Sequence, residues 1–245
     1  MRILAIDTAT ENCSAALLVD DGVTLRERLL ERGHAEVILP MVDEVLAEAA
    51  VALTALTAIA FGRGPGAFTG VRLAASVAQG LAFGAGLPVV PISDLRALAQ
   101  RAMATDAGIM RVLACTDARM REVYWGYFER TSDGLAGAVG EEHVGKPSAV
   151  ALPRAWCGEA QAFARPGSAK PVPVYGAGPG FAAYPELRRG VAGAADTVLH
   201  RLLPRASEIV QLAAPEVTAG RVLPAEQALP VYLRDEVAQR RPGSH

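Results

Sequence analysis

Cysteine, histidine and lysine are scarce in this sequence of 245 residues, and their scarcity excludes several classes of protein. The three cysteines lie far apart without a Cys-x-x-Cys pair, which argues against a structural metal site and favours a reducing compartment. No two of the four histidines have the spacing of a helical metal site, so a zinc peptidase is not expected. Lys146 follows glycines at the spacing of a Walker A loop, but Pro147 stands where a Mg²⁺-binding Ser or Thr is needed.

Long apolar runs and a strong net charge are missing as well. No stretch reaches the roughly 18 apolar residues of a membrane span, and a strand is predicted almost at the N-terminus. We therefore expect a cytoplasmic protein with no signal peptide and no membrane contact. The net charge of −2, without a basic tail, indicates that the chain alone does not hold nucleic acid tightly. Hydrophobic residues still make up 51% of the sequence, enough for a substantial core.

The run from Gly62 to Arg72, with the sequence GRGPGAFTGVR, carries the strongest local signal. It follows a strand-like apolar segment and precedes an apolar, alanine-rich segment, so the predicted order is strand, tight turn and helix. Glycines let other groups approach the backbone closely, and the free N–H groups of a helix N-terminus can hold an anion. Three interpretations are open: a phosphate site, a surface against which another backbone packs, and a plain turn.

The same pattern occurs again later in the chain. The run from Gly176 to Gly180 repeats Gly-x-Gly-Pro-Gly, and each copy lies downstream of a predicted hairpin with an acidic residue at its first bend, Asp7 or Asp117. This ordered recurrence of hairpin, helix, strand, glycine turn, helix, strand and helix indicates a duplication. Strands that alternate with helices predict an α/β protein with a mixed sheet flanked by helices in each half. That description fits the duplicated actin-like, Hsp70 and sugar-kinase fold.

We therefore expect two lobes, residues 1–106 and residues 107–245. The least regular segment is residues 131–170, where glycines, prolines and scattered charges favour loops and short strands inserted in the second lobe. The C-terminal segment is a candidate to return to the first lobe.

Six residues are candidates for contacts with a nucleotide or another anion: Asp7, Thr8, Gly64, Gly66, Gly176 and Gly178. Asp7 ends the first predicted strand, where actin-like ATPases place an acid that organises Mg²⁺. The simpler interpretation, in which Asp7 and Thr8 only hydrogen-bond their own turn, is favoured. Its basis is Glu11-Asn12-Cys13, which is bulkier than the glycine-rich hairpin of such ATPases and adds a negative charge. No catalytic residue and no metal ligand is assigned.

Two predicted helices of the first lobe are apolar over more than one face. The helix after His34 has an apolar stripe widened by neighbouring residues, and the helix after Thr69 offers small side chains on several sides. Core packing explains part of this pattern, and a protein interface is the alternative for the rest. The residues expected at such an interface are Ile38, Met41, Val42, Val45, Ala74, Ala75, Ala78 and Leu81.

Several blocks of the sequence resemble the TsaB (YeaZ) family of bacterial proteins. These blocks are ILAIDTATENCSAALL, His34 with Leu39-Pro40, GRGPGAFTGVRLAASVAQGLA, the run from Asp117 to Gly126, and PVYLRDEVA. They cover most of the first lobe and scattered parts of the second. The resemblance implies the two-lobed actin-like fold and a part in making threonylcarbamoyladenosine in tRNA, next to the anticodon.

The resemblance also implies a division of labour. The related TsaD carries the transferase site and holds a metal with histidines at a helix start, whereas the matching stretch Ser93–Leu98 contains no histidine. A non-catalytic scaffold is implied, which binds a TsaD-like subunit and a TsaE-like ATPase, forms a homodimer when alone and reaches tRNA only through the complex. Despite an older glycoprotease-like name, no peptidase chemistry is expected.

The resemblance implies no cofactor on the chain alone and leaves ATP at an interface of the complex open. It also implies that association uses the helices after His34 and after Thr69. The alternative function is a stand-alone actin-like ATPase or small-molecule kinase, which would use Asp7 and the glycine turns.

Overall fold

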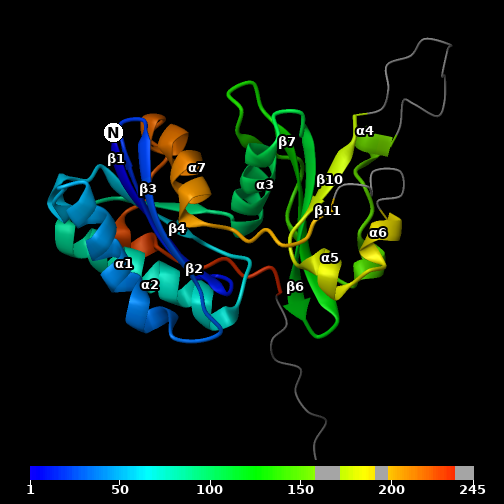
Figure 1. The fold of residues 1–245 in the computed structure, drawn as a ribbon, viewed down its shortest axis with the longest axis horizontal. Helices are drawn as coiled ribbons and strands as arrows, with labels where there is room; N and C mark the ends of the chain where they lie inside the picture. Colours follow the sequence, from blue (N-terminus) through cyan, green and yellow to red (C-terminus); the bar gives the residue numbers. More distant parts are fainter. Residues whose placement is uncertain (158–171, 191–197, 235–245) are drawn as a thin grey trace, which may run out of the picture.

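The computed structural model of the chain has two lobes side by side, each built on one sheet with helices beside it (Figure 1). The structure describes residues 1–157, 172–190 and 198–234. Within these ranges, no helix combines the length and the apolar character that crossing a membrane requires. The predicted α/β class with mixed sheets is confirmed.

The first lobe contains a five-stranded sheet in the order β3-β2-β1-β4-β5. Strand β1 pairs antiparallel with β2 and parallel with β4, and β4 pairs parallel with β5. Two long helices, α1 and α2, belong to this lobe. The bounds are Arg2–Asp7 for β1, Asn12–Val19 for β2, Gly22–Leu29 for β3, Ala58–Gly62 for β4, Val89–Ile92 for β5, His34–Glu48 for α1 and Phe68–Ala85 for α2.

The second lobe contains a six-stranded sheet in the order β11-β10-β6-β7-β8, with β9 also paired to β7. The bounds are Arg111–Arg119 for β6, Glu122–Arg130 for β7, Ala136–Ala138 for β8, His143–Gly145 for β9, Val174–Ala177 for β10 and Val198–Leu199 for β11. The remaining helices are α3 at Asp94–Thr105, α4 at Arg154–Cys157, α5 at Gly180–Ala183, α6 at Leu187–Gly190 and α7 at Ala206–Thr218. The expected insertion therefore contains β8, β9 and α4, and its residues 158–170 lie outside the described part.

The strand order confirms the duplicated fold. In each lobe, a central strand forms an antiparallel hairpin with the next strand and pairs in parallel with the strand that leads into a glycine turn. Thus β1, β2 and β4 of the first lobe correspond to β6, β7 and β10 of the second. Beyond these, β5 and β11 extend the two sheets at the same edge.

Both faces of the first sheet are buried. In β1, Leu4 and Ile6 pack toward α1 and α2, whereas Ile3 and Ala5 pack toward α7. A strand that is covered on both sides has no polar face, which explains why β1 and β4 are nearly continuous apolar runs. Figure 1 shows the first sheet between α7 on one side and α1 with α2 on the other.

The helices α3 and α7 each cover the sheet of the other half of the chain. Leu95, Leu98 and Ala99 of α3 pack against the second sheet, although α3 directly follows β5 of the first sheet. Helix α7 follows β11 but packs against the first sheet. After α7, Leu223 pairs with Val89 at the edge of the first sheet. The two sheets thus lie in residues 1–106 and 107–245, while α3 and α7 pack across that division.

Candidate functional site

The first glycine turn joins β4 to α2 and is filled by the backbone of the turn after β1. A Cβ atom placed on Gly66 would lie 2.6 Å from the carbonyl oxygen of Ala9, and one on Gly70 would overlap the carbonyl oxygen of Thr8. The Ala67 N–H donates to the Ala9 oxygen (2.8 Å), and the Thr8 hydroxyl donates to the Gly70 oxygen (2.7 Å). The glycines thus allow a second backbone to approach, as in the second of the three interpretations.

This packing corrects the expected anion contacts of the first turn. Thr8 is buried and its hydroxyl is already used, and the space above Gly66 is occupied by the chain itself. The N–H of Gly64 donates to Oδ2 of Asp94 (2.5 Å), so this group is not free for an anion either. Thr8, Gly64 and Gly66 are packing residues in this structure.

The second glycine turn follows β10 and is filled in the same way. A Cβ atom on Gly178 would overlap the carbonyl oxygen of Cys115, and one on Gly176 would lie 2.7 Å from the ring of Phe181. The Gly178 N–H donates to the Leu199 oxygen (3.1 Å). The helix that follows, α5, has only four residues. The expected anion contacts at Gly176 and Gly178 are corrected for the same reason as those of the first turn.

Asp7 ends β1 and its side chain has no access to solvent. Its Oδ1 accepts a hydrogen bond from the Ala9 N–H (2.8 Å), as the turn-forming interpretation requires. Burial raises the pKa of Asp7 to about 6, while the bond from Ala9 and a hydrogen bond with the Asp94 carboxyl lower it. The carboxylate is therefore part of the interior and offers no open side to a ligand from solvent.

The start of α3 carries the stretch Ser93–Leu98. The Ser93 hydroxyl caps the helix by accepting from the Arg96 N–H (3.1 Å), and Leu98 is buried in the core of the second lobe. His34 lies elsewhere, with its Nε2 atom 2.8 Å from the Thr10 oxygen. In the described residues, no group of three or more His, Cys, Asp or Glu side chains is placed to share a metal ion.

Seven of the eight residues expected at a partner interface lie in the core. Their side chains are at most 2% exposed and pack against the first sheet: Ile38, Met41, Val42, Val45, Ala74, Ala75 and Ala78. Leu81 is partly buried. The expectation was wrong for these seven because an apolar stripe at helical spacing marks the face that a helix turns toward its sheet. A partner that binds α1 and α2 must contact their opposite face.

Part of that opposite face carries small and apolar residues. On α2, Ser76, Gly80 and Gly84 are exposed at four-residue spacing, and a Cβ atom on either glycine would meet nothing within 4 Å. Phe83 of α2 is 69% exposed and Leu39 of α1 is 46% exposed. We call Leu39, Ser76, Gly80, Phe83 and Gly84 the outer helix face. Large apolar side chains that are exposed on a surface mark a candidate docking site.

Comparisons with known proteins identify the family. The family model for TsaD, tRNA N6-adenosine threonylcarbamoyltransferase, matches residues 27–241. The tRNA threonylcarbamoyladenosine biosynthesis protein TsaB of Escherichia coli is 41% identical, with 98% of both chains covered. The protein of the same name from Haemophilus influenzae is 38% identical, over 98% of this chain and 97% of the relative. The solved structure of YeaZ from Pseudomonas aeruginosa superposes with a TM-score of 0.82 at 44% identity, covering 95% of this chain and 99% of that one.

The chain belongs to the TsaB family. The resemblance noted from the sequence blocks is thus confirmed, together with the two-lobed fold it implied.

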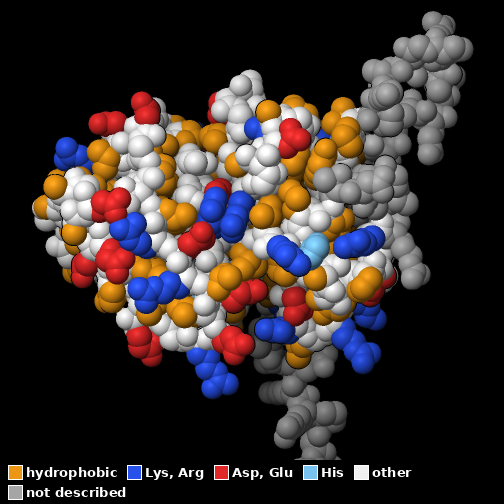
Figure 2. Space-filling model, viewed as in Figure 1, with side chains coloured by type: hydrophobic (Ala, Val, Ile, Leu, Met, Phe, Trp, Pro, Cys, Tyr) orange, Lys and Arg blue, Asp and Glu red, His pale blue; other side chains and the backbone are white. Residues whose placement is uncertain are grey.

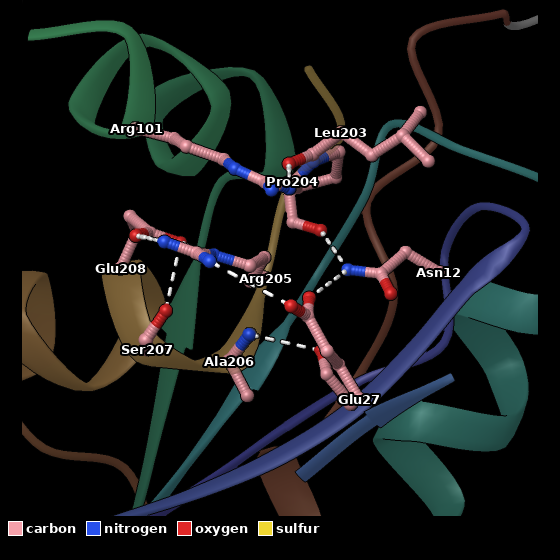
Figure 3. A network of polar contacts seen from close by, with 10 residues as sticks. Asn12, Glu27, Arg101, Leu203, Pro204, Arg205, Ala206, Ser207 and Glu208 are labelled. Atoms are coloured by element: carbon pink, nitrogen blue, oxygen red, sulfur yellow. Dashed lines mark hydrogen bonds and ion pairs between the residues drawn. The ribbon is translucent and has the colours of Figure 1, made fainter. Parts of the chain in front are cut away.

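This TsaB-family chain also contains a partly buried polar network that the sequence did not reveal (Figure 3). The network holds the connection that leads from the second lobe back to α7. The side-chain amide of Asn12 donates to the Pro204 oxygen and to Oε2 of Glu27, each at 3.2 Å. The Ala206 N–H, at the start of α7, donates to the Ser14 hydroxyl (3.0 Å). Asn12 is 192 positions from Pro204, so no local pattern predicts this contact.

Arginines from α3 and from the start of α7 extend the network. Arg101 of α3 donates to the Leu203 oxygen (2.8 Å), and Arg205 pairs with Glu208 of α7 through two hydrogen bonds of 2.6 and 2.9 Å. Arg205 also approaches Glu27 of the first lobe at 3.7 Å. In Figure 3 these side chains converge on the backbone of the connection from different elements. The two lobes are thus joined by packed, hydrogen-bonded chain and not by a loose hinge.

In the described part of the TsaB-family chain, a larger and a smaller cleft are found between the lobes. The larger, of about 450 Å³, is lined by three arginines and two glutamates that pair with one another: Arg63 with Glu142, and Arg96 and Arg221 with Glu216. The smaller, of about 360 Å³, has Glu11, Glu31, His200 and Arg201 among its lining residues. Asp7 lines neither cleft, so the best catalytic candidate of the sequence is separated from both.

Proposed function

We propose that this chain is the non-catalytic scaffold and activator of the complex that transfers threonylcarbamoyl to the tRNA adenosine next to the anticodon. In this role it binds a TsaD-like catalytic subunit and joins a TsaE-like ATPase. Its family membership supports the pathway, because the curated relatives are named for tRNA threonylcarbamoyladenosine biosynthesis. The transfer itself takes place on the partner.

One observation carries the scaffold role: both glycine turns are occupied by this chain's own backbone. The carbonyl groups of Thr8 and Ala9 fill the first turn, and the carbonyl group of Cys115 fills the second. A stand-alone ATPase or kinase of this fold needs open turns, because phosphates must reach backbone N–H groups. The buried position of Asp7 counts against that alternative as well.

The outer helix face is the surface that we assign to the partner. Its small residues allow a second helix to approach closely, while Phe83 and Leu39 supply apolar area around them. A specific contact would bury on the order of 1,200–2,000 Å² in total. A TsaD-like chain is the occupant we propose, and a second copy of this chain takes its place when the partner is absent.

Binding of tRNA through the complex is supported by the charge distribution. The net charge is −2, and Figure 2 shows a face on which acidic and basic side chains are interspersed over the described residues. A chain of this net charge gains little from phosphate contacts. We therefore expect the partner to supply most of the affinity for tRNA, and ATP to act at the TsaE-like subunit or at an interface of the complex.

The test is reconstitution with TsaD-like and TsaE-like proteins, ATP, threonylcarbamoyl-adenylate and an ANN-decoding tRNA. Incorporation of labelled threonine into tRNA should depend on this chain. Gly84→Arg should abolish both co-purification with the TsaD-like protein and incorporation, because it places a long charged side chain on the outer helix face. The variant should still unfold cooperatively at nearly the wild-type temperature, since Gly84 has open space around it.

Two matched variants complete the experiment. Ala104→Arg, at an exposed position of α3 away from the outer helix face, should keep full activity. Ala78→Arg should prevent folding, because Ala78 is completely buried against the first sheet. Equal incorporation with and without the wild-type chain would refute the activator role. Full association of Gly84→Arg would refute the assigned surface.

A further inference from the structure

Two buried carboxyl groups meet beneath the first glycine turn. Asp7 at the end of β1 and Asp94 at the start of α3 have 0% and 2% of their surface exposed. Both converge on Gly62 of β4: a Cβ atom there would overlap Oδ1 of Asp94 and would lie 3.0 Å from Oδ1 of Asp7. The carboxyl groups are close enough to hydrogen-bond each other if one of them carries a proton.

Each carboxyl group is satisfied on one oxygen only. Oδ1 of Asp7 accepts from the Ala9 N–H, and Oδ2 of Asp94 accepts from the Gly64 N–H. The other oxygens, Oδ2 of Asp7 and Oδ1 of Asp94, are buried without a donor. Two unpartnered carboxylate oxygens in the interior are strongly unfavourable, because neither water nor a countercharge compensates them.

We propose that Asp7 and Asp94 share one proton, so that one carboxyl group donates a hydrogen bond to the other. A single proton satisfies both remaining oxygens and removes one of two like charges from the interior. The hydrogen-bonded pair then links two turns of the backbone. Through Ala9 it holds the turn after β1, and through Gly64 it holds the glycine turn against that first turn.

The surroundings favour a proton over a metal ion. Divalent cations such as Mg²⁺ and Ca²⁺ take about six or more oxygen ligands, whereas no third acidic, histidine or cysteine side chain is grouped with this pair in the described chain. Two charged groups on neighbouring helices change the pKa of Asp7: His34 of α1 lowers it, and Glu208 of α7 raises it. The nearby thiol of Cys13 is buried, and Asp7 helps to raise its pKa to about 12, so this group stays neutral. The charge of Arg63 lowers the pKa of Asp94.

Protonation of the pair makes stability depend on pH in a defined direction. Burial, with the charge of the other acid, holds the pKa of Asp94 well above 3.8, and burial raises the pKa of Asp7 to about 6. The folded chain therefore binds more protons than the unfolded chain above pH 3.8. The stabilisation is fully present below that pH and is lost as the pH rises through the folded pKa values. Where Asp7 is ionised and Asp94 still holds the proton, the folding equilibrium constant should fall about tenfold per pH unit.

The experiment is urea unfolding of the whole chain at a series of pH values above 6, with Asp94→Asn as the main variant. The NH₂ group of asparagine can donate a hydrogen bond to Asp7 at any pH, because it needs no titrating proton. The amide oxygen can still accept from the Gly64 N–H. We expect the variant to lose the tenfold slope and to exceed the wild type in stability at alkaline pH. Asp7→Asn should flatten the slope as well. Asp117→Asn, at the corresponding bend of the second lobe, should keep the wild-type slope.

Infrared spectroscopy of the wild-type chain tests the proton directly, even where a variant does not fold. Among the described Asp and Glu residues, Asp7 and Asp94 are the two whose pKa values are raised. A carbonyl band of a protonated carboxylic acid should be present at pH 7 and disappear at alkaline pH. A missing band, or a slope that both Asn variants retain, would overturn the proposal. So would a slope that Mg²⁺ or Ca²⁺ abolishes, since the pair would then be a cation site. None of these results depends on the proposed role in tRNA modification.

Discussion

The two lobes share a strand order but differ in what surrounds it. In the first lobe, α1 and α2 have 15 and 18 residues, whereas α5 and α6 of the second lobe have four each. The acid at the first bend differs as well: Asp7 is fully buried, while the side chain of Asp117 is 27% exposed and is bonded by the Arg119 N–H and the Tyr184 hydroxyl. The described parts of both copies share the strand order, the filled glycine turn and an acid at the bend that accepts from the backbone N–H two residues later. The comparison teaches that close backbone packing preserves a duplicated element, whereas outer helices and the burial of the bend acid are free to differ.

The largest expected effect comes from filling a glycine turn. Gly70→Ala in the first lobe and Gly178→Ala in the second should each cost about 3 kcal/mol or more, because the new Cβ overlaps a carbonyl oxygen. Gly80→Ala lies in the same helix as Gly70 but in open space, and it should stabilise the chain by about 0.5–1 kcal/mol. Denaturant midpoints of the three variants decide the point. Near-equal midpoints for Gly70→Ala and Gly80→Ala would show that the backbone around Gly70 can shift to accommodate a Cβ atom.

A smaller effect is expected at the two connections between the lobes, one from β5 to α3 and the other from β11 to α7. Asn12→Ala should cost about 2 kcal/mol, because it leaves the buried Pro204 oxygen without a donor and removes a bond to Glu27. Ser93→Ala, at the other connection, should cost about 1 kcal/mol through the lost helix cap of α3. Thermal unfolding of both variants provides the comparison. A larger loss of stability in Ser93→Ala than in Asn12→Ala would mean that the connection from β5 to α3, and not the one from β11 to α7, holds the lobes together.

The smallest effect concerns the bend of the second lobe. Arg119, Met120 and Arg121 all have positive φ angles, of 62°, 55° and 61°, which side chains other than glycine rarely adopt. Met120 is 81% exposed, and its sulfur accepts a hydrogen bond from Arg234 (3.2 Å). Met120→Gly relieves backbone strain at the cost of this contact and of chain entropy, so it should stabilise the chain by only about 0.5 kcal/mol. A fall in the unfolding midpoint would instead assign Met120 a packing role. The buried bend at Asp7 offers no equivalent substitution.

Much of the fold was predictable from the sequence because its signals are local. Apolar runs, the two glycine turns and the acid at each bend gave the strands and the duplication, and the structure confirms them. The direction in which a helix faces was not predictable: the stripe with Ile38 and Val45 was assigned to a partner, yet it packs on the sheet. The contacts of Asn12 with Pro204 and of Asp7 with Asp94 join distant positions, and sequence spacing carries no information on such pairs.

Helix α3 of the first half covers the second sheet, and α7 of the second half covers the first sheet. This crossed packing has a consequence for synthesis of the chain. The first sheet is complete in sequence by Ile92, but one of its faces stays uncovered until Ala206–Thr218 has been made. The N-terminal half therefore cannot fold as an independent unit while the ribosome is still translating the second sheet, and it exposes the apolar side chains of Ile3, Ala5 and Ala60 during that interval. Cutting the gene between the sheets would leave each product without the helix that covers it. The order of translation thus makes folding of this chain a single late event.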